Sequence, residues 1–390
     1  EHHRMNIIII TEEPFPVGWA GTNRILSLSK GFVEQYARVK VLCLRPQEKP
    51  EEGIVNKEAR GTVGRVEFEY AAGTTIRGRT FLRRRWQKAV GLFRTILVVK
   101  NIPDRSPSDT MLLYNQRSLI FVLFFFFLSR AYHYLMICDV EEHPQIYLRK
   151  SLFLGLLDRI SLKFSFKLYD AVLVITNHLE KEFIGRVRRG VPLLNVPMTV
   201  EADRFLNSRS QKPDTSDYIA YCGDVRGNKD GVADLINAFV LIAKKYDHLK
   251  LYIIGDAPGT DALMRLKELS RSLGLDGKIV FTGRVLRDDM PGYLCHATIL
   301  ALARPVSLQA QFGFPSKLGE YLSTGNPVVV TRVGEIPLYL EDGKTAFIAE
   351  PDNIGQFAGK LEYVIEHPDL AREVGLRGRV VALDNFDYKL

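Results

Sequence analysis

The stretch at residues 313–330 combines a lysine and a glutamate with the elements needed to hold them. Pro315 suits the first turn of a helix, and Ser316 is the predicted N-cap, which leaves Lys317 beside free backbone N–H groups. A helix N-terminus with a lysine in its first turn attracts anions such as phosphate. Glu320, one turn further on, can offer its carboxylate to the paired hydroxyls of a sugar ring. The alternative is an ordinary α/β unit in which Lys317 and Glu320 are simply solvated.

The neighbouring residues predict how this helix is positioned. Leu318, Tyr321 and Leu322 recur at helical spacing and give it one apolar face. Gly325 is placed to end the helix, and residues 328–330 form a fully apolar strand. A loop, a short helix and a buried strand in this order are typical of a parallel α/β domain.

A second candidate for binding phosphate is the glycine-rich segment at residues 223–231, which leads into a predicted helix. Gly223 begins this segment, and Arg226 and Lys229 supply two cations. Each charge-assisted hydrogen bond from such a loop to a phosphate would contribute roughly 1.5–3 kcal/mol. A solvated basic turn is the alternative interpretation.

Carboxylates and a histidine lie where the apolar strand predicted at residues 135–140 ends. Asp139, Glu142 and His143 would therefore lie at the carboxyl end of a strand, where α/β domains bind their ligands. Such groups can serve an acceptor hydroxyl as hydrogen-bond partners or as a base, and a structural or merely solvated role is the alternative. No second ligand cluster accompanies them, so no metal site is predicted.

Length and composition predict a folded protein of two domains. The 390 residues exceed one ordinary core, and 46% hydrophobic and 25% charged residues are typical of globular proteins. The net charge of +8 predicts a preference for anions, which include nucleotide sugars, phospholipid surfaces and nucleic acids. No nucleic-acid-binding module is recognised, so nucleic acid is not a predicted partner. The four cysteines are far apart, which indicates neither a disulfide framework nor a zinc site and favours a cytoplasmic setting.

The order of strands and helices predicts two similar halves. Residues 1–4 resemble the end of an expression tag; residues 5–10 then form an apolar strand, and a loop with Gly18 and Gly21 leads into a helix. The same pattern of strand, glycine-containing loop, helix and strand restarts at residue 218. Each half therefore predicts a doubly wound sheet. The glycines do not form the dinucleotide fingerprint, so a nicotinamide cofactor is not expected.

Two apolar stretches of the first half raise the question of a membrane. Residues 81–100 predict a basic amphipathic helix, typical of a membrane-surface element and equally of a surface helix whose apolar face covers the core. Residues 119–128 are apolar throughout and too short to span a bilayer. A helix buried between layers is predicted there, with partial insertion into a membrane as the alternative. The apolar face of the first helix is formed by Leu82, Trp86, Val90, Phe93 and Leu97.

The order of motifs in residues 313–347 resembles the retaining glycosyltransferases of family 4, which have the GT-B fold. It is similar in particular to bacterial members that build cell-surface polysaccharide or lipopolysaccharide. The resemblance covers most of residues 218–355 and extends only loosely to the first half. It is carried by Gly313-Phe314-Pro315, Glu320, Gly325 with Pro327-Val328-Val329, and Val333-Gly334-Glu335-Ile336-Pro337.

This resemblance implies a donor site. Glu320 is expected to hold the ribose, and Lys229 and Lys317 to neutralise the leaving diphosphate; Arg226 is a candidate to assist them through its charge, since the resemblance alone does not assign it. Backbone around residues 284–285 is expected against the base, and the two glycines of the first loop near the phosphates. The implied donor-binding residues are Gly18, Gly21, Gly223, Arg226, Lys229, Arg284, Val285, Gly313, Phe314, Pro315, Ser316, Lys317, Leu318 and Glu320.

Two positions depart from the family pattern. Phe312 stands where the family has the first of two glutamates eight positions apart, and Asp224 stands where it has an arginine. The donor sugar is therefore expected to be held differently from the family norm.

The fold prediction is α/β, with two doubly wound Rossmann-like domains facing a cleft (GT-B). The domains are placed at residues 5–205, on the acceptor side, and 206–370, on the nucleotide-sugar side. A helical segment at residues 371–390 is expected to cross back to the first domain.

The predicted function is transfer of a sugar from a nucleotide sugar, UDP-sugars among them, to a glycan or lipid-linked acceptor with retention of anomeric configuration. Lys229, Lys317, Glu142 and His143 are the predicted catalytic residues, and no metal or other cofactor is expected. A nucleotide-sugar epimerase or phosphorylase, or an inactive membrane-associated binding protein, is the alternative. The predicted location is the cytoplasm, or the inner face of the cell membrane if the basic helix binds an anionic membrane surface.

Overall fold

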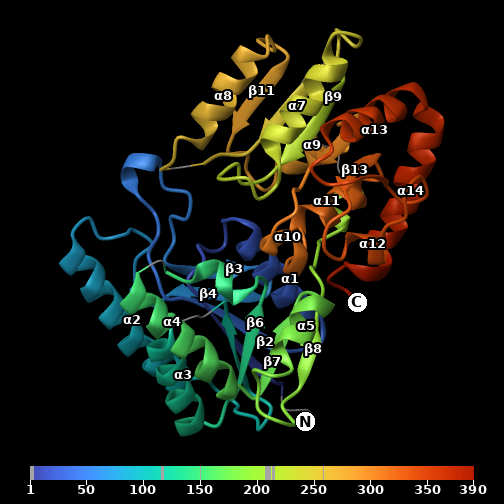
Figure 1. Ribbon diagram of the computed structural model, residues 1–390. Coiled ribbons are helices and arrows are strands. Elements are labelled where there is room, and N and C mark those ends of the chain that lie inside the picture. Colours follow the sequence, from blue (N-terminus) through green and yellow to red (C-terminus); the bar gives the residue numbers. More distant parts are fainter. Residues whose placement is uncertain (1–3, 116–117, 150, 207–211, 213–215, 258) are drawn as a thin grey trace. The chain divides into compact units, whose positions relative to one another are not determined.

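Two compact units make up the computed structural model, and the chain passes from one to the other between Pro197 and Met198 (Figure 1). The structure describes residues 4–115, 118–149, 151–206, 212, 216–257 and 259–390. Each unit is a mainly parallel sheet flanked by helices, as the repeated pattern of strand, loop and helix predicted.

The sheet of the first unit has the order β3-β4-β2-β1-β5-β6-β7-β8, and only β3 pairs antiparallel with its neighbour. β1 is central because its run of isoleucines is apolar on both faces and is buried on both. The chain leaves β1 toward β2 and later returns to β5 on the other side, so the topological switch lies between β1 and β5. The strands are β1 (Asn6–Thr11), β2 (Arg38–Cys43), β3 (Arg60–Val63), β4 (Val66–Tyr70), β5 (Thr110–Tyr114), β6 (Leu135–Val140), β7 (Ala171–Val174) and β8 (Leu193–Asn195).

Five α-helices and three short 3-10 helices connect the described strands of this unit. Figure 1 shows α2, α3 and α4 together along one side of it. The α-helices are α1 (Ala20–Glu34), α2 (Phe81–Lys100), α3 (Leu119–Ala131), α4 (Leu152–Phe164) and α5 (Asn177–Phe183), and the 3-10 helices are η1 (Pro50–Glu52), η2 (Pro144–Tyr147) and η3 (Ser165–Lys167).

The predicted burial of the apolar stretch at residues 119–128 is only half right. α3 packs Phe121, Val122 and Phe125 into the core, whereas Ile120 and Phe127 are 78% and 67% exposed within this unit. A helix that is apolar all round can bury only the side that meets the sheet, because no described residue of this unit covers its other side.

The second unit is a six-stranded parallel sheet of order β11-β10-β9-β12-β13-β14, with its switch point between β9 and β12. The predicted strand at residues 328–330 is β13, which is fully buried. The strands are β9 (Tyr218–Cys222), β10 (Lys250–Ile254), β11 (Ile279–Gly283), β12 (Ile299–Leu302), β13 (Val328–Thr331) and β14 (Phe347–Ala349). The helices are α6 (Asp203–Leu206), α7 (Val232–Ala243), α8 (Ala262–Ser272), α9 (Met290–Cys295), α10 (Leu308–Phe312), α11 (Ser316–Thr324), α12 (Ile336–Tyr339), α13 (Ile354–Glu366) and α14 (Pro368–Asn385).

The boundary between the units falls earlier than the predicted division after residue 205. Val200 pairs with the end of the chain, because its N–H donates to the carbonyl of Phe386 (2.8 Å) and its carbonyl accepts from the N–H of Tyr388 (3.1 Å). α6 packs on α9 and α11 of the second unit. Residues 198–206 therefore belong to the second unit.

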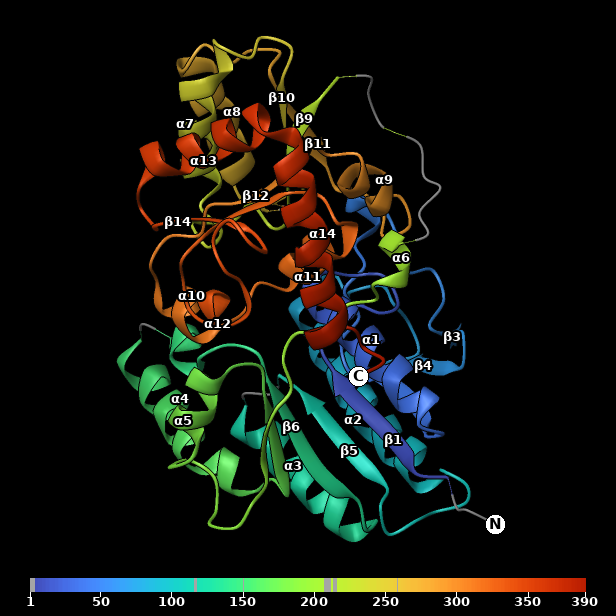
Figure 2. The ribbon, with the colours of Figure 1, turned by 90° about the vertical axis from the view of Figure 1, so that its right-hand side faces the viewer.

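The C-terminal helix belongs to the second unit and is not the separate segment that was predicted, whereas a crossing of the chain end back to the first domain stays a prediction. α14 packs along α11 within the second unit, as Figure 2 shows. A side chain at Gly375 would collide with the backbone of residues 325–326, so the two helices approach closely at this glycine. We therefore assign residues 368–388 to the second unit.

Candidate functional site

The carboxyl ends of β9, β10 and β11 are drawn together at three glycines. The N–H of Gly255 donates to the carbonyl of Gly283 (3.0 Å), and the N–H of Gly223 donates to the carbonyl of Ile254 (2.9 Å). A Cβ atom at Gly255 would overlap the carbonyl oxygen of Gly223, so no other residue fits there. This edge of the sheet therefore presents closely spaced backbone at the place where ligands of doubly wound sheets bind.

α11 brings Lys317 to this edge. The Tyr321 hydroxyl bonds to the backbone N–H of Cys222 (2.6 Å), which ties α11 to the end of β9. The lysine side chain lies across Gly223, where an added Cβ would come within 2.6 Å of the lysine Cε. The two stretches that the sequence singled out for phosphate, residues 223–231 and 315–322, are thus neighbours.

One detail of the predicted helix start is wrong. Pro315 occupies the N-cap position and Ser316 is the first helical residue, so the serine is not the cap. The carbonyl of Pro315 accepts a hydrogen bond from the N–H of Leu318 (2.9 Å). Lys317 nevertheless stays in the first turn, and Gly325 ends the helix in the left-handed conformation as predicted.

Lys317 pairs with Asp230, and Arg304 lies on the other side of the same carboxylate. The Arg304 Nε is 3.4 Å from Asp230 Oδ1, and the Tyr221 hydroxyl donates to Oδ2 at 2.9 Å. Asp230 and Arg304 are 3% and 1% exposed. We call Lys317, Asp230 and Arg304 the Asp230 cluster. It holds two cations and one carboxylate, so it carries a net charge of +1.

These two cations decide the protonation of Asp230. Burial raises the pKa of its carboxyl, but the Lys317 ammonium and the Arg304 guanidinium outweigh burial and lower the pKa to about 2. The carboxylate is therefore charged at neutral pH. A phosphate at this edge would compete with it for the Lys317 ammonium.

The sequence did not identify Asp230 or Arg304. Arg304 follows β12, and its Nε also lies 3.4 Å from the backbone carbonyl of Lys229. A side chain at Gly231 would overlap the carbonyl oxygen of Ala303, so this loop is packed against the end of β12. The available signals were the position of Arg304 shortly after the apolar strand at residues 299–302 and the position of Asp230 in the glycine-rich segment that leads into α7.

Arg226, a cation of the glycine-rich loop, forms an ion pair with a carboxylate of the same loop. The Arg226 Nε donates to both carboxylate oxygens of Asp224, at 2.9 and 2.8 Å, and the two side chains are 48% and 37% exposed. Lys229 is half-buried in the same loop. Asp224, which replaces the expected arginine, therefore holds Arg226 in this structure.

Glu320 is joined to the segment after β11 through an arginine. Its Oε1 lies 3.4 Å from Arg204 NH1, and Arg204 also donates to the backbone carbonyl of Arg287. Arg284, exposed, and Val285, half-buried, directly follow β11. The structure thus links Glu320 to the loop that carries the two residues predicted to face the base.

Two predicted donor residues, Phe314 and Leu318, serve packing. Phe314 stacks between aromatic rings, 5.4 Å from the centroids of both Tyr339 and Phe386. Leu318 is fully buried, and Gly313 and Pro315 are buried beside them. Phe314 and Leu318 position α11, and Phe312, which replaces a glutamate, ends α10.

In the first unit, the two glycines of the N-terminal loop fit the start of α1. A Cβ at Gly18 would overlap the Thr22 hydroxyl, and one at Gly21 would lie 3.0 Å from the Tyr114 hydroxyl and 3.1 Å from Glu13 Cγ. Both glycines therefore allow the first turn of α1 to approach neighbouring side chains. Their predicted role beside donor phosphates stays a prediction.

The acidic stretch after β6 is built differently from its prediction. Asp139 is fully buried and accepts two hydrogen bonds from the Arg24 guanidinium, at 2.8 and 3.0 Å. His143 is also buried; its Nδ1 accepts from the N–H of Gln145 (3.3 Å), and its Nε2 lies 3.5 Å from Glu182 Oε1. Burial lowers the pKa of His143, although Glu182 opposes this shift. Asp139 is therefore a structural ion-pair partner, and the half-buried Glu142 stays a candidate.

The neighbouring Glu141 was missed by the sequence prediction. Its carboxylate is 3.4 Å from Arg24 Nε and 22% exposed. Burial raises the pKa of Glu141 to about 7; the attraction of Arg24 opposes the shift and the Asp139 carboxylate adds to it. A carboxyl group with a pKa near neutrality can give or take a proton at neutral pH.

A hollow of about 300 Å³ opens at the switch point of the first sheet, between the ends of β1 and β5. Its walls carry carboxylates and cations together, which suits a polar ligand. The lining residues are Thr11, Glu12, Glu13, Arg45, Lys88, Tyr114, Asn115, Ser118 and Phe121.

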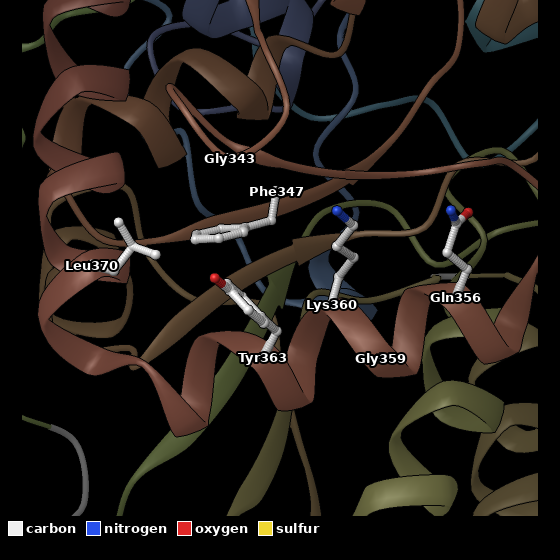
Figure 3. A pocket seen from close by; sticks show the side chains of 7 residues that line it. All are labelled: Gly343, Phe347, Gln356, Gly359, Lys360, Tyr363 and Leu370. Carbon is white, nitrogen blue, oxygen red and sulfur yellow. The ribbon is translucent and has the colours of Figure 1, made fainter.

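The second unit has another hollow, of about 440 Å³, between β14 and α13 (Figure 3). Phe347 and Tyr363 face each other there with ring centroids 6.0 Å apart, and the Lys360 ammonium is paired with Asp342 (2.6 Å). No residue predicted from the sequence lines it. We therefore place the candidate site at the Asp230 cluster. Within the described ranges, no group of three or more His, Cys, Asp and Glu side chains is arranged to hold a metal ion.

Residues 216–367 match the family model described as Glycosyl transferases group 1. This range contains the whole Asp230 cluster and the predicted donor residues of the second unit. The match ties the second unit to that family.

Two curated relatives match parts of the chain. A GDP-mannose-dependent alpha-(1-6)-phosphatidylinositol monomannoside mannosyltransferase of Mycolicibacterium smegmatis is 23% identical over 230 residues, which are 56% of this chain and 59% of the relative. The N-acetyl-alpha-D-glucosaminyl L-malate synthase of Bacillus anthracis is 26% identical over 155 residues, which are 40% of this chain and 38% of the relative. The chain thus spans less than two thirds of the length of either relative.

Solved structures match over nearly the whole chain. Sucrose-phosphate synthase from Thermosynechococcus elongatus has a TM-score of 0.74 at 14% identity and covers 99% of this chain and 96% of its own. HepE of Anabaena in complex with UDP-glucose has a TM-score of 0.71 at 15% identity, with coverages of 99% and 96%. The chain therefore has the GT-B fold, as predicted.

Proposed function

We propose that this protein transfers a sugar from a nucleoside-diphosphate sugar to the hydroxyl of an acceptor. The observation that carries the proposal is the Asp230 cluster, with its net charge of +1 beneath the glycine-lined carboxyl edge of the second sheet. The family match over residues 216–367 supports it, and so do relatives named as sugar transferases. A neighbour of the same fold was solved with UDP-glucose.

The chemistry that we propose for this edge is stabilisation of a leaving diphosphate. Negative charge develops on the leaving group as the bond to the sugar breaks, and fixed cations that meet this charge are usually the largest catalytic contribution. Lys317 is the first candidate because its ammonium lies beside Gly223 at the strand end. Lys229 assists from the loop, and Arg226 does so when it leaves Asp224.

The remaining donor contacts are proposed from the positions of their elements. Glu320 would hold the ribose, and backbone at residues 284–285 would lie against the base. Backbone at Gly313 and residues 315–316, at the start of α11, would line the donor. Retention of anomeric configuration and independence of metal ions are further parts of this proposal.

The first unit would receive the acceptor. The hollow between β1 and β5 offers the carboxylates of Glu12 and Glu13 to hydroxyls and the cations Arg45 and Lys88 to an anionic group. Glu142 and His143 remain candidates for this role. A glycan or lipid-linked acceptor, as in bacterial polysaccharide or lipopolysaccharide assembly, agrees with this mixture of charges.

Binding of nucleotides to matched variants tests the proposal. We expect one of UDP, GDP, ADP or TDP to raise the melting temperature of the protein, because a ligand at a hundred times its Kd adds about 2.7 kcal/mol of apparent stability. Lys317→Ala should remove most of this shift and lower turnover of the matching nucleotide sugar by about 10²–10³-fold. Lys344→Ala, at an exposed lysine of the same unit, is the control.

Two outcomes would contradict the proposal. One is the absence of a shift with any nucleotide, which favours the inactive binding protein. The other is an unchanged response in Lys317→Ala. Product formed from the nucleotide sugar alone, or with inorganic phosphate, would indicate the epimerase or phosphorylase instead.

A further inference from the structure

The buried and exposed sides of α2 are the reverse of those in an ordinary amphipathic surface helix. Its buried side consists of Gln87, Gly91, Thr95 and Val99, which recur every four residues. The Gln87 amide is held on both sides: its Oε1 accepts from the N–H of Gly78 (2.8 Å) and its Nε2 donates to the carbonyl of Ile76 (2.9 Å). The polar and small side of the helix thus meets the rest of the unit.

The apolar side of the same helix is exposed within this unit. Leu82, Trp86 and Phe93 are 78%, 70% and 63% exposed. The interpretation in which this side covers the core is therefore wrong. Exposed aromatic and aliphatic groups in one row leave a large apolar area in contact with water unless another surface covers it.

α3 and α4 continue this apolar surface. The Lys88 ammonium lies 4.0 Å from the centroid of the Phe121 ring, which joins α2 to α3, and α3 contacts α4. Figure 1 shows the three helices side by side. We call their exposed side the α2–α4 face. Its large apolar residues are Phe81, Leu82, Trp86, Phe93, Leu97, Ile120, Leu123, Phe127, Leu156, Leu157, Ile160 and Phe164.

The three helices that form the α2–α4 face also carry the excess charge of the protein. The three helices contain nine Lys and Arg residues and a single acidic residue, Asp158, so their net charge is +8. The whole chain has the same net charge of +8, and the rest of it is neutral in sum. The cations are Arg83, Arg84, Arg85, Lys88, Arg94, Lys100, Arg130, Arg159 and Lys163.

We propose that the α2–α4 face binds the surface of an anionic phospholipid bilayer. Basic side chains interleaved with tryptophan and phenylalanine are the composition that an interfacial helix needs, because the rings enter the acyl boundary while the cations meet lipid phosphates. No helix of the described segments is long and apolar enough to cross a membrane. The proposed contact is with one leaflet, as for an interfacial helix.

Charge argues for lipid over the other surfaces that could cover this face. A second copy of the chain would bring one net charge of +8 against another. A negatively charged lipid surface pairs with the exposed cations of these helices, such as Arg83 and Arg85, at the same time. This proposal does not rest on the proposed sugar transfer.

Co-sedimentation with vesicles tests it. The full chain should bind vesicles of phosphatidylcholine mixed with phosphatidylglycerol, bind vesicles of phosphatidylcholine alone much more weakly, and lose most binding at high salt. The triple change Arg83→Gln, Arg84→Gln, Arg85→Gln should weaken binding to the mixed vesicles by on the order of a hundredfold, since each cation contributes about tenfold or somewhat less. Trp86→Ala should also weaken binding.

The matched control removes the same charge from the second unit through Lys244→Gln, Lys267→Gln and Arg271→Gln, which are all exposed. This control should bind the mixed vesicles like the parent, and a thermal melt of each variant confirms folding. Equal losses in both triple variants would mean that only net charge matters and would overturn the assignment to α2. Absence of binding at low salt would also overturn it, as would a dimer in solution that depends on Trp86 without any binding to vesicles.

Discussion

Each unit has a buried ionic cluster at the carboxyl edge of its sheet, and the two clusters have opposite composition. In the first unit, Arg24 lies between two carboxylates, those of Asp139 and Glu141. In the second, Asp230 lies between two cations, Lys317 and Arg304. The same sheet architecture thus ends in an excess of carboxylate in one unit and an excess of cation in the other.

This difference indicates which kind of ligand each sheet edge can bind. In the first unit, the second carboxylate can take up a proton near neutral pH. Burial raises the pKa of Glu141 to about 7; Arg24 opposes this shift, and the Asp139 carboxylate adds to it. The second unit has one cation more than it has carboxylates. Because lysine and arginine side chains are ordinarily charged at neutral pH, this excess positive charge favours the binding of an anion. The proposed division into an acceptor side and a phosphate side follows from this contrast.

The largest effect that we expect from removing one member of these ionic clusters is a loss of stability. Arg24→Ala would leave the fully buried Asp139 without its guanidinium partner, at a cost of about 3–5 kcal/mol in the free energy of unfolding. Denaturant unfolding of the parent and the variant measures this. A loss below 1 kcal/mol would mean that the cluster is solvated and that the contrast fails.

The second prediction concerns acid. The pKa of Asp230 is lowered from 3.8 to about 2, so its charged form stabilises the folded state above pH 4, and this contribution is lost as the pH falls through 2. The contribution is about 2 kcal/mol. Asp230→Asn should be less stable than the parent at pH 7, and the difference should shrink toward pH 2. Parallel stability curves over this range would contradict the assignment.

The smallest effect that we expect is that of Glu141, whose contribution to stability changes with pH in the direction opposite to that of Asp230. The pKa of Glu141 is raised from 4.5 to about 7, so its contribution to stability is present below pH 4.5 and is lost as the pH rises to 7. Glu141→Gln imitates the protonated form. It should match the parent at low pH and exceed it above pH 7 by on the order of 1–2 kcal/mol, an amount kept small by partial exposure. A variant that is less stable at pH 8 would show that the folded state prefers the charged carboxylate.

The sequence predicted those parts of the site that lie within one run of chain. Residues 313–330 read correctly as loop, helix and strand, and Lys317 lies in the first turn of α11 as expected. Asp230 and Arg304 escaped prediction because their pairing joins residues 74 positions apart, one just before α7 and the other just after β12. Asp139 was assigned to the acceptor because its partner, Arg24, is remote in sequence.

Periodicity was informative in a different way. It located α2 to the residue and identified the apolar side, yet it did not predict which side meets the sheet. The buried side is made of Gln87, Gly91 and Thr95, whose small or hydrogen-bonded side chains allow close approach. Apolar spacing indicates which side of a helix is removed from water. Whether that side meets the protein core or a bilayer depends on how closely the residues of the opposite side can pack on the sheet.

The hollow at the switch point of the first sheet shares Lys88 and Phe121 with the helices of the α2–α4 face. A protein held by that face would search for a lipid-linked acceptor in two dimensions, and the acceptor would reach the hollow by lateral diffusion within the leaflet. Its rate would then follow the mole fraction of acceptor among the lipids. Adding inert anionic lipid at constant total acceptor would slow turnover by surface dilution, although the amount of bound protein rises.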